Sequence, residues 1–255
     1  AGSGIGMRRT VVNAVYDLAR RDDRVVFVGS DLGPDVLDNL KQDMPDRFYM
    51  EGISEQYLVG MAAGLAMEGM VPYVSTISSF LPRRCYEQVA LDLCLHNVPV
   101  RLISTGAGAV YAPLGPTHLA VEDIAILRVL PNMAIVAPCD APEAARLMDA
   151  SLAWPGPLYI RLAKGGDPIV SQEAVPFEIG KAILMREPGE VLFVTTGVMT
   201  QVALDAANIL EENSIKAGIL HMHTIKPMDV AALFEAARNV KALVTVEEHT
   251  RIGGL

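Results

Sequence analysis

The sequence predicts an α/β protein built from two consecutive three-layer α/β/α units with mostly parallel sheets. Two observations support this. Almost continuous apolar runs alternate with amphipathic segments, and a stretch rich in Gly, Pro and polar residues divides this series in two. Strands that are apolar on both faces and lie between helices are typical of parallel sheets covered by helices on both sides. With 255 residues, of which 51% are hydrophobic, the chain can form one large or two medium domains.

The first unit contains five apolar runs of strand character, each bounded by turn residues. We expect strands at 25–29, 71–77, 98–104, 133–137 and 158–162. Apolar residues recur at helical spacing between them. We expect helices at about 8–21, 55–69, 82–96, 119–128 and 141–152. The order predicts strand–helix–strand units and a parallel sheet.

The second unit follows a break at 163–176 that contains Gly165, Gly166, Pro168 and Pro176. Its expected strands are 191–196, 216–222 and 242–247, and its expected helices are about 199–213 and 228–238. We therefore divide the chain into a first domain at 7–165, a linker at 166–178 and a second domain at 179–255. Residues 1–6 resemble a remnant of an expression vector. Because the sequence stops just after a strand, we also expect the natural chain to extend beyond Leu255.

Composition narrows the class of function. A net charge of −9 disfavours nucleic acid or an anionic membrane as partner. No run approaches the length of an apolar membrane span, and no signal peptide is visible, which favours a cytoplasmic protein. Three scattered cysteines lie in apolar contexts, so we expect reduced core residues. They are Cys85, Cys94 and Cys139.

Glu55 is the most informative single residue, because it lies in the first turn of an apolar helix rich in small residues. Ser54 precedes it as an expected N-cap. Burial beside this helix favours a carboxyl group that keeps a proton and can share it with a ring nitrogen. The alternative is an ordinary first-turn Glu that complements the helix dipole.

Several separated motifs occur in a specific order and spacing. They are Gly29-Ser30-Asp31-Leu32, Glu55 on its helix, Ser78-Ser79-Phe80-Leu81-Pro82-Arg83, Gly115-Pro116-Thr117-His118, Thr195-Thr196-Gly197, Ile225-Lys226-Pro227-Met228-Asp229 and Val246-Glu247-Glu248-His249. From Met7 to Leu255 this pattern resembles the C-terminal half of the transketolase family. That family includes 1-deoxyxylulose-5-phosphate synthases and the β subunits of 2-oxo acid dehydrogenases.

The resemblance implies a pyrimidine-binding domain followed by a transketolase C-terminal domain, with thiamine diphosphate as cofactor. In this family a second domain holds the diphosphate through Mg²⁺ or Ca²⁺, using a Gly-Asp-Gly motif and a downstream Asn. This chain has no Gly-Asp-Gly motif and no evident set of hard oxygen ligands, so we expect no metal site in it. A partner subunit would then bring the metal and the diphosphate site, and an α2β2 heterotetramer is the expected assembly.

The resemblance also assigns roles around the cofactor. Glu55 matches the acid that hydrogen-bonds the pyrimidine ring and favours its imino form. Phe80 matches the aromatic residue that stacks on that ring, although an ordinary core Phe is the alternative. Arg83 matches an active-site Arg, and a surface ion pair explains it nearly as well. Asp31 matches an Asp near the cofactor, but Asp is also a common turn residue.

Three further residues are candidates for contacts with the substrate. His118 ends the family's substrate-facing loop and could bind substrate or move a proton, or it could serve a local role at the start of a helix. Arg161 matches a residue that contacts a substrate phosphate, and Lys164 could assist it. Solvated charges near the linker are the alternative for both.

The sequence departs from the family at three positions that contact sugars in its members. Leu114, Gly106 and Ala107 replace an Asp, a His and an Arg, respectively. Losing groups that hydrogen-bond hydroxyls or phosphate relaxes or redirects specificity. The Gly-rich run that begins at Gly106 is also expected to be bare and flexible. His221 and His223 alternate on a strand, but without a third ligand at suitable spacing a metal site there is not expected.

The leading hypothesis is the pyrimidine-binding subunit of a split transketolase-like enzyme, which transfers a two-carbon unit from a ketose or ketose phosphate to an acceptor. A 2-oxo acid dehydrogenase β subunit that passes an acyl unit to a lipoyl or carrier thiol is the first alternative. The lost sugar-contacting residues favour it, whereas Phe80, Arg83 and the loop ending at His118 favour the leading hypothesis. A non-catalytic scaffold is the third possibility, and retention of Glu55 argues against it.

Overall fold

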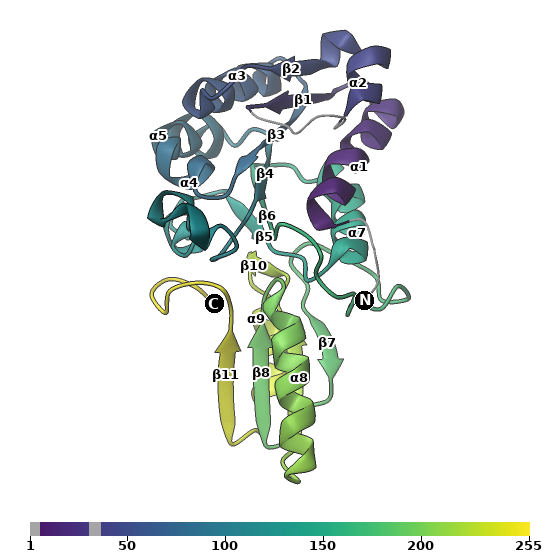
Figure 1. Ribbon diagram of the computed structural model, residues 1–255, viewed down its shortest axis with the longest axis vertical. Helices are drawn as coiled ribbons and strands as arrows, with labels where there is room; N and C mark the ends of the chain where they lie inside the picture. Colours follow the sequence, from purple (N-terminus) through teal and green to yellow (C-terminus); the bar gives the residue numbers. More distant parts are fainter. Residues whose placement is uncertain (1–5, 31–36) are drawn as a thin grey trace.

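The computed structural model describes residues 6–30 and 37–255, and its strands form two sheets. The first sheet contains β1 (Val25–Gly29), β2 (Phe48–Met50), β3 (Val71–Ile77), β4 (Arg101–Thr105), β5 (Ala134–Val136), β6 (Leu158–Leu162) and β10 (Thr224–Lys226). The second contains β7 (Ile183–Arg186), β8 (Val191–Thr195), β9 (Ala217–His221) and β11 (Ala242–Val246). The two units lie one above the other along the long axis (Figure 1).

Both sheets are mostly parallel. The first has the order β10-β5-β6-β4-β3-β1-β2, and β10 is antiparallel to its neighbour. The second has the order β11-β8-β9-β7, and β7 is antiparallel to its neighbour. The strands β1, β3, β4 and β6 are buried along nearly their whole length, as expected for a sheet covered on both faces. The predicted fold class is confirmed.

Helices cover both faces of each sheet. In the first unit they are α1 (Met7–Arg21), α2 (Asp38–Asp43), the 3₁₀ turn η1 (Pro45–Arg47), α3 (Glu55–Met67), α4 (Phe80–Arg84), α5 (Tyr86–Gln88), the π-helix η2 (Val89–Leu95), the 3₁₀ turns η3 (Ala112–Leu114) and η4 (Pro116–His118), α6 (Asp123–Arg128) and α7 (Ala141–Leu152). In the second they are α8 (Met199–Glu212) and α9 (Val230–Ala237). Helices α1 and α7 share one core cluster, whereas α3, η2 and α6 share the other.

Most predicted elements exist close to their expected bounds, and the differences have local causes. The helix expected at 82–96 is divided into α4, α5 and η2, and it begins earlier, at Phe80. The helix expected at 119–128 begins at Asp123, because Ala120 first forms a two-way backbone bridge with Gly108. Elements α2, β2, β7 and β10 were not predicted. They are three to six residues long, too short for a clear periodic signal.

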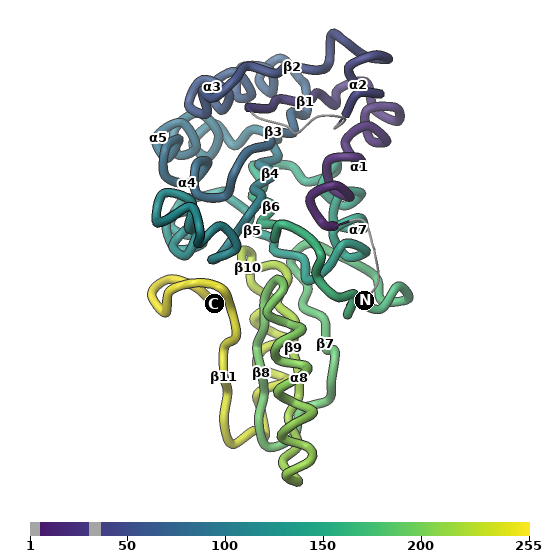
Figure 2. Tube along the Cα trace, in the orientation of Figure 1, coloured from purple at the N-terminus to yellow at the C-terminus, as the bar shows by residue number. Residues whose placement is uncertain are grey.

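The two units are connected by more than the linker. Strand β10 follows β9 of the second sheet but pairs with β5 of the first, so the second half of the chain completes the first sheet. The backbone trace shows this crossing between the two bodies (Figure 2). The second unit therefore contributes one strand to the sheet of the first.

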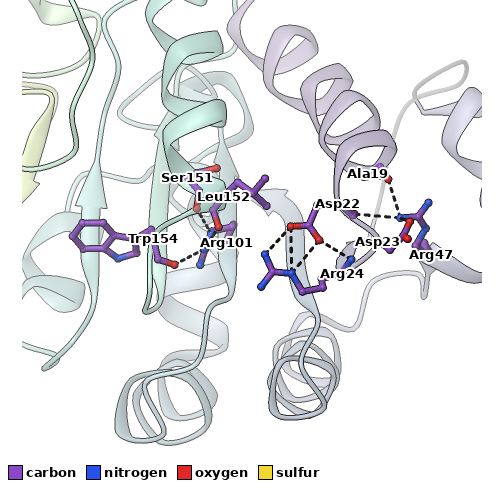
Figure 3. A network of polar contacts seen from close by, with 9 residues as sticks. All are labelled: Ala19, Asp22, Asp23, Arg24, Arg47, Arg101, Ser151, Leu152 and Trp154. Carbon is purple, nitrogen blue, oxygen red and sulfur yellow. Dashed lines mark hydrogen bonds and ion pairs between the residues drawn. The ribbon is translucent and has the colours of Figure 1, made fainter.

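Arg101 stabilises the end of α7 from inside the protein (Figure 3). Its guanidinium donates to the carbonyl oxygens of Ser151, Leu152, Trp154 and Gly156, at distances from 2.5 to 3.3 Å. A cation at a helix C-terminus satisfies carbonyl groups that have no partner within the helix. Burial lowers the pKa of Arg101 to about 10, and the side chain remains a cation at neutral pH.

The three cysteines are free and buried, as predicted. Burial raises the pKa of Cys85 to about 12 and that of Cys94 to about 11, and it also raises the pKa of Cys139. Thiols of this kind are not reactive at neutral pH. Among the described residues no helix is long and apolar enough to cross a bilayer.

Candidate active site

A hollow of about 220 Å³ opens at the carboxyl ends of β1, β3 and β4. In open parallel sheets this edge is where ligands bind. Its floor is polar, because Ser30 and Thr76 share a buried hydrogen bond of 2.9 Å between their hydroxyl groups. Its walls carry mixed chemistry, with one acid, one cation, two aromatic rings and two exposed aliphatic side chains. These wall residues are Glu55, Arg8, Phe80, Tyr111, Ile53 and Leu114.

Glu55 is the first residue of α3, and only 5% of it is exposed. Leu58, Val59 and Ala62 of the same helix are fully buried and fix its position. Ser54 occupies the N-cap position, but the predicted capping bond is absent: its hydroxyl group donates to the Glu51 carbonyl oxygen instead. The carboxylate lines both this hollow and a second, more open one of about 530 Å³ beside it.

Phe80 begins α4 and lines the same hollow as Glu55. The structure therefore brings together the two side chains that the sequence assigned to the pyrimidine. Arg84, one helical turn further on, contacts both of them. Its guanidinium carbon lies 3.6 Å from the Phe80 ring centroid, and its Nη1 atom lies 3.3 and 3.4 Å from the two carboxylate oxygens of Glu55.

His118 lies at the end of η4, and its ring packs edge-on against Phe80 with 5.2 Å between centroids. Arg83 fixes the backbone around it. The Arg83 Nη2 atom donates to the carbonyl oxygens of Thr117 and Leu119 at 2.9 and 3.0 Å, and Nη1 lies 3.3 Å from the carboxylate of Glu122. Arg83 thus contacts the loop that carries His118, and it does not line the hollow.

Arg161 lies under this region and is almost fully enclosed. Its Nε atom lies 2.7 Å from the Asp123 carboxylate, and Nη2 donates to the carbonyl oxygens of Ala120 and Glu248. These contacts hold the start of α6 and the segment after β11 together. Lys164 is exposed, with Nζ 5.3 Å from the Tyr111 ring centroid. Asp31 lies outside the described residues.

The segment after β4 is more closely packed than the sequence suggested. Gly106 has a φ of +79°, and a Cβ atom there would clash with the ring of Tyr111. Glu248 packs in the same way against Gly108. The expected bare loop is therefore filled by Tyr111 and Glu248, and Gly106 is required by this close approach. Ala107 is buried, whereas Leu114 is exposed and lines the hollow.

The sequence analysis missed several residues of this site, among them Arg8, Ile53, Arg84 and Tyr111. Arg84 directly follows the residue that was singled out, and a second Arg one position later is the signal that could have found it. Tyr111 ends the Gly-rich run, where an aromatic residue with small neighbours indicates close packing.

The hollow fits an aminopyrimidine in one directly observed respect. At its edge, next to the more open hollow that Arg84 lines, the planar Arg84 guanidinium with its N–H donors stacks on Phe80 and hydrogen-bonds to Glu55. An aminopyrimidine is also planar and carries an N–H group, so the same two side chains suit it.

A potential metal-binding cluster lies elsewhere. Among the described residues, Cys139, Glu143 and His221 could approach one ion. The fold places Cys139 and Glu143 next to His221, although His221 lies far from them in the sequence. However, both ring nitrogens of His221 are hydrogen-bonded, to Glu143 and Thr200, and burial opposes ionisation of the Cys139 thiol. None of the three residues lines the hollow at Glu55.

Comparison with known proteins decides the family. The family model of the transketolase pyrimidine-binding domain matches residues 3–166, and that of the transketolase C-terminal domain matches residues 180–255. The chain belongs to the transketolase family. This confirms the resemblance drawn from the sequence motifs.

Individual relatives of this transketolase-family chain support the assignment. A transketolase family protein, y4mN, of Sinorhizobium fredii is 42% identical over 95% of the chain and 71% of its own length. One of the subunits of the apulose-4-phosphate transketolase of Phocaeicola vulgatus is 35% identical to this chain. That match covers 100% of this chain and 82% of the relative. The solved structure of a split gene transketolase, described as an inactive beta4 tetramer, has a TM-score of 0.91 and 36% identity, and the match covers 99% of this chain and 83% of that one.

Proposed function

We propose that this chain is the pyrimidine-side subunit of a split, thiamine-diphosphate-dependent transferase. The observation that carries the proposal is the placement of Glu55 and Phe80 in one hollow at the carboxyl edge of the sheet. A nearly buried carboxylate is costly unless it is paired, and the side chain that pairs with Glu55 here is the half-exposed Arg84. The family supplies the ligand, because its members use thiamine diphosphate.

Two side chains of the hollow and one beside it then have roles. The Glu55 carboxyl group holds a proton at the pyrimidine ring nitrogen and selects the tautomer, while Phe80 stacks on the ring and excludes water. His118, packed against Phe80, is placed to donate a hydrogen bond to the substrate or to move a proton. When bound, the cofactor supplies the nucleophilic carbon that cleaves the bond next to a substrate carbonyl.

A second subunit is needed to hold the rest of the cofactor. We propose that it carries the Gly-Asp-Gly motif and the Mg²⁺ or Ca²⁺ that binds the diphosphate. The active sites then lie between subunits, and an α2β2 tetramer is the natural closed assembly. The relatives that are themselves transketolase subunits, and the split gene transketolase, support this division.

For the reaction, we propose transfer of a two-carbon ketol unit from a ketose or ketose phosphate. Lys164 is exposed near Tyr111 and is the better placed cation for a phosphate. Arg161 contributes indirectly, because Asp123 and two carbonyl oxygens engage its guanidinium. In that position it orients α6 and Glu248 around the site.

A second candidate function is supported by Leu114, which presents an exposed apolar side chain to the hollow. A small 2-oxo acid needs fewer hydroxyl contacts than a sugar and tolerates this wall. The chain would then be a 2-oxo acid dehydrogenase-type β subunit that passes an acyl unit to a lipoyl or carrier thiol.

The test is turnover by the chain assembled with its diphosphate-binding partner, with ketose phosphates and 2-oxo acids as alternative donors. Glu55→Gln should lower kcat by about 10²- to 10⁴-fold, the usual range for loss of acid–base catalysis. The exposed Glu68→Gln, at the other end of the same helix, is the matched control and should leave kcat unchanged. Full activity of Glu55→Gln would refute a catalytic site at this residue, and a scaffold role would then lead.

A further inference from the structure

Arg84 makes a pair of contacts that the proposed function does not explain. One face of the Phe80 ring is covered by its guanidinium at 3.6 Å, and both oxygens of Glu55 lie within 3.4 Å of its Nη1 atom. These are the two groups that the proposed function assigns to the cofactor ring. A ring cannot stack on the same face of Phe80 and hydrogen-bond Glu55 while the guanidinium remains there.

The side chain is also free to leave. Its exposed fraction is 47%, compared with 6% for the Glu55 side chain, and it lines the more open hollow next to Glu55. In contrast, the neighbouring Arg83 is held by several backbone carbonyl groups of the loop that carries His118. The two adjacent arginines therefore have different roles: Arg83 is fixed, whereas Arg84 can be displaced into solvent.

We propose that Arg84 is an internal placeholder that covers Glu55 and one face of Phe80, at the edge of the hollow, until the aminopyrimidine of the cofactor displaces it. The inference rests on the proposed function. In the free subunit the guanidinium neutralises Glu55 and covers the apolar face of Phe80, and both would otherwise be left unpaired. Cofactor binding then exchanges one planar N–H donor for another.

This exchange has a measurable cost in affinity. When only a fraction of the protein molecules can bind, the apparent Kd equals the intrinsic Kd divided by that fraction. The combined free energy of a partly exposed ion pair and a cation–π contact is large enough to reduce that fraction on the order of tenfold. Removing the guanidinium should therefore tighten cofactor binding, whereas most substitutions in a binding site weaken it.

The experiment measures the Kd of thiamine diphosphate, with saturating Mg²⁺, by titration calorimetry on the chain assembled with its diphosphate-binding partner. We expect Arg84→Gln to lower Kd on the order of tenfold. Arg84→Lys keeps the charge but not the flat stacking face, and its Kd should fall between those of Arg84→Gln and the wild type. Arg20→Gln, an exposed arginine on α1, is the control and should not change Kd.

The outcomes separate this inference from the proposed function. If Arg84→Gln binds the cofactor equally well or more weakly while Glu55→Gln and Phe80→Ala weaken binding, the placeholder role is overturned and the proposed function stands. If the wild-type complex does not bind thiamine diphosphate, or Glu55→Gln and Phe80→Ala bind it as the wild type does, both are overturned. An unfolding double-mutant cycle on Arg84 and Glu55 in the free chain adds a readout without cofactor: a coupling of zero contradicts the placeholder role.

Discussion

The Oε2 atom of Glu143 lies 2.9 Å from the Nε2 atom of His221, and this buried pair connects α7 of the first unit to β9 of the second. Burial opposes ionisation of Glu143, but His221 and the Cys139 backbone N–H outweigh it, and the pKa of Glu143 is held at about 2. The two units are thus joined by a buried hydrogen bond as well as by strand β10.

Breaking this pair should destabilise the whole chain. His221→Ala leaves a buried carboxylate without its side-chain partner, and we expect the free energy of unfolding to fall by about 3–5 kcal/mol. Urea denaturation followed by circular dichroism measures this. Glu190→Gln, which breaks the exposed pair with Lys241, is the control and should cost less than about 1 kcal/mol. Equal effects of the two variants would contradict a special role for the buried pair.

Removal of the Arg101 guanidinium should have a similarly large effect. Arg101→Met leaves the carbonyl groups at the end of α7 without donors inside the protein, so we expect a loss of about 3 kcal/mol or more. Arg24→Met removes an exposed contact with Asp22 and should change stability by less than about 1 kcal/mol. Equilibrium denaturation measures both losses. An Arg101→Met protein as stable as the wild type would contradict the stabilising role of Arg101 at the end of α7.

His223 should make stability depend on pH. Burial lowers its pKa from an ordinary 6.5 to about 4, so the folded state binds fewer protons than the unfolded state between these values. Its contribution is fully present above pH 6.5 and is lost as the pH falls toward 4, by at most about 3 kcal/mol.

Replacing His223 tests this dependence. We expect His223→Gln to show a shallower fall in the free energy of unfolding between pH 6.5 and 4. The exposed His96→Gln should retain the wild-type slope. Parallel curves for wild type and His223→Gln would show that other groups cause the dependence.

Arg83 should act on catalysis by positioning His118. Arg83→Gln frees the carbonyl oxygens of Thr117 and Leu119, and we expect kcat/KM for the donor to fall on the order of tenfold. Because Arg83 does not line the hollow at Glu55, the Kd of thiamine diphosphate should stay the same. Arg83→Lys should recover part of kcat/KM. A Kd that weakens as much as kcat/KM falls would instead place Arg83 in the cofactor site.

The sequence predicted the sheet architecture because long apolar runs carry a clear signal. It also placed Glu55 at the start of its helix, as the structure shows, whereas Phe80, expected just before a helix, is the first residue of α4. Contacts between distant segments could not be predicted in this way. Arg101 at the end of α7 and His221 beside Glu143 depend on how helices pack against the sheets.

Contacts between side chains within the site could not be predicted from the sequence either. Nothing in the spacing indicates that Arg84 contacts Glu55, or that Asp123 engages Arg161. Gly106 was interpreted as the loss of a polar group, but the ring of Tyr111 shows a steric requirement for glycine there. Such relationships depend on the positions of side chains from several elements at once.

The central claim is that Glu55 acts on a cofactor whose diphosphate another subunit holds. The most direct measurement is the Kd of thiamine diphosphate for this chain alone, for its Gly-Asp-Gly partner alone, and for their mixture with wild-type or Glu55→Gln chain. We predict that the wild-type mixture binds far more tightly than either part, and that Glu55→Gln weakens this binding. Tight binding by this chain alone, or a mixture indifferent to Glu55→Gln, would contradict the account.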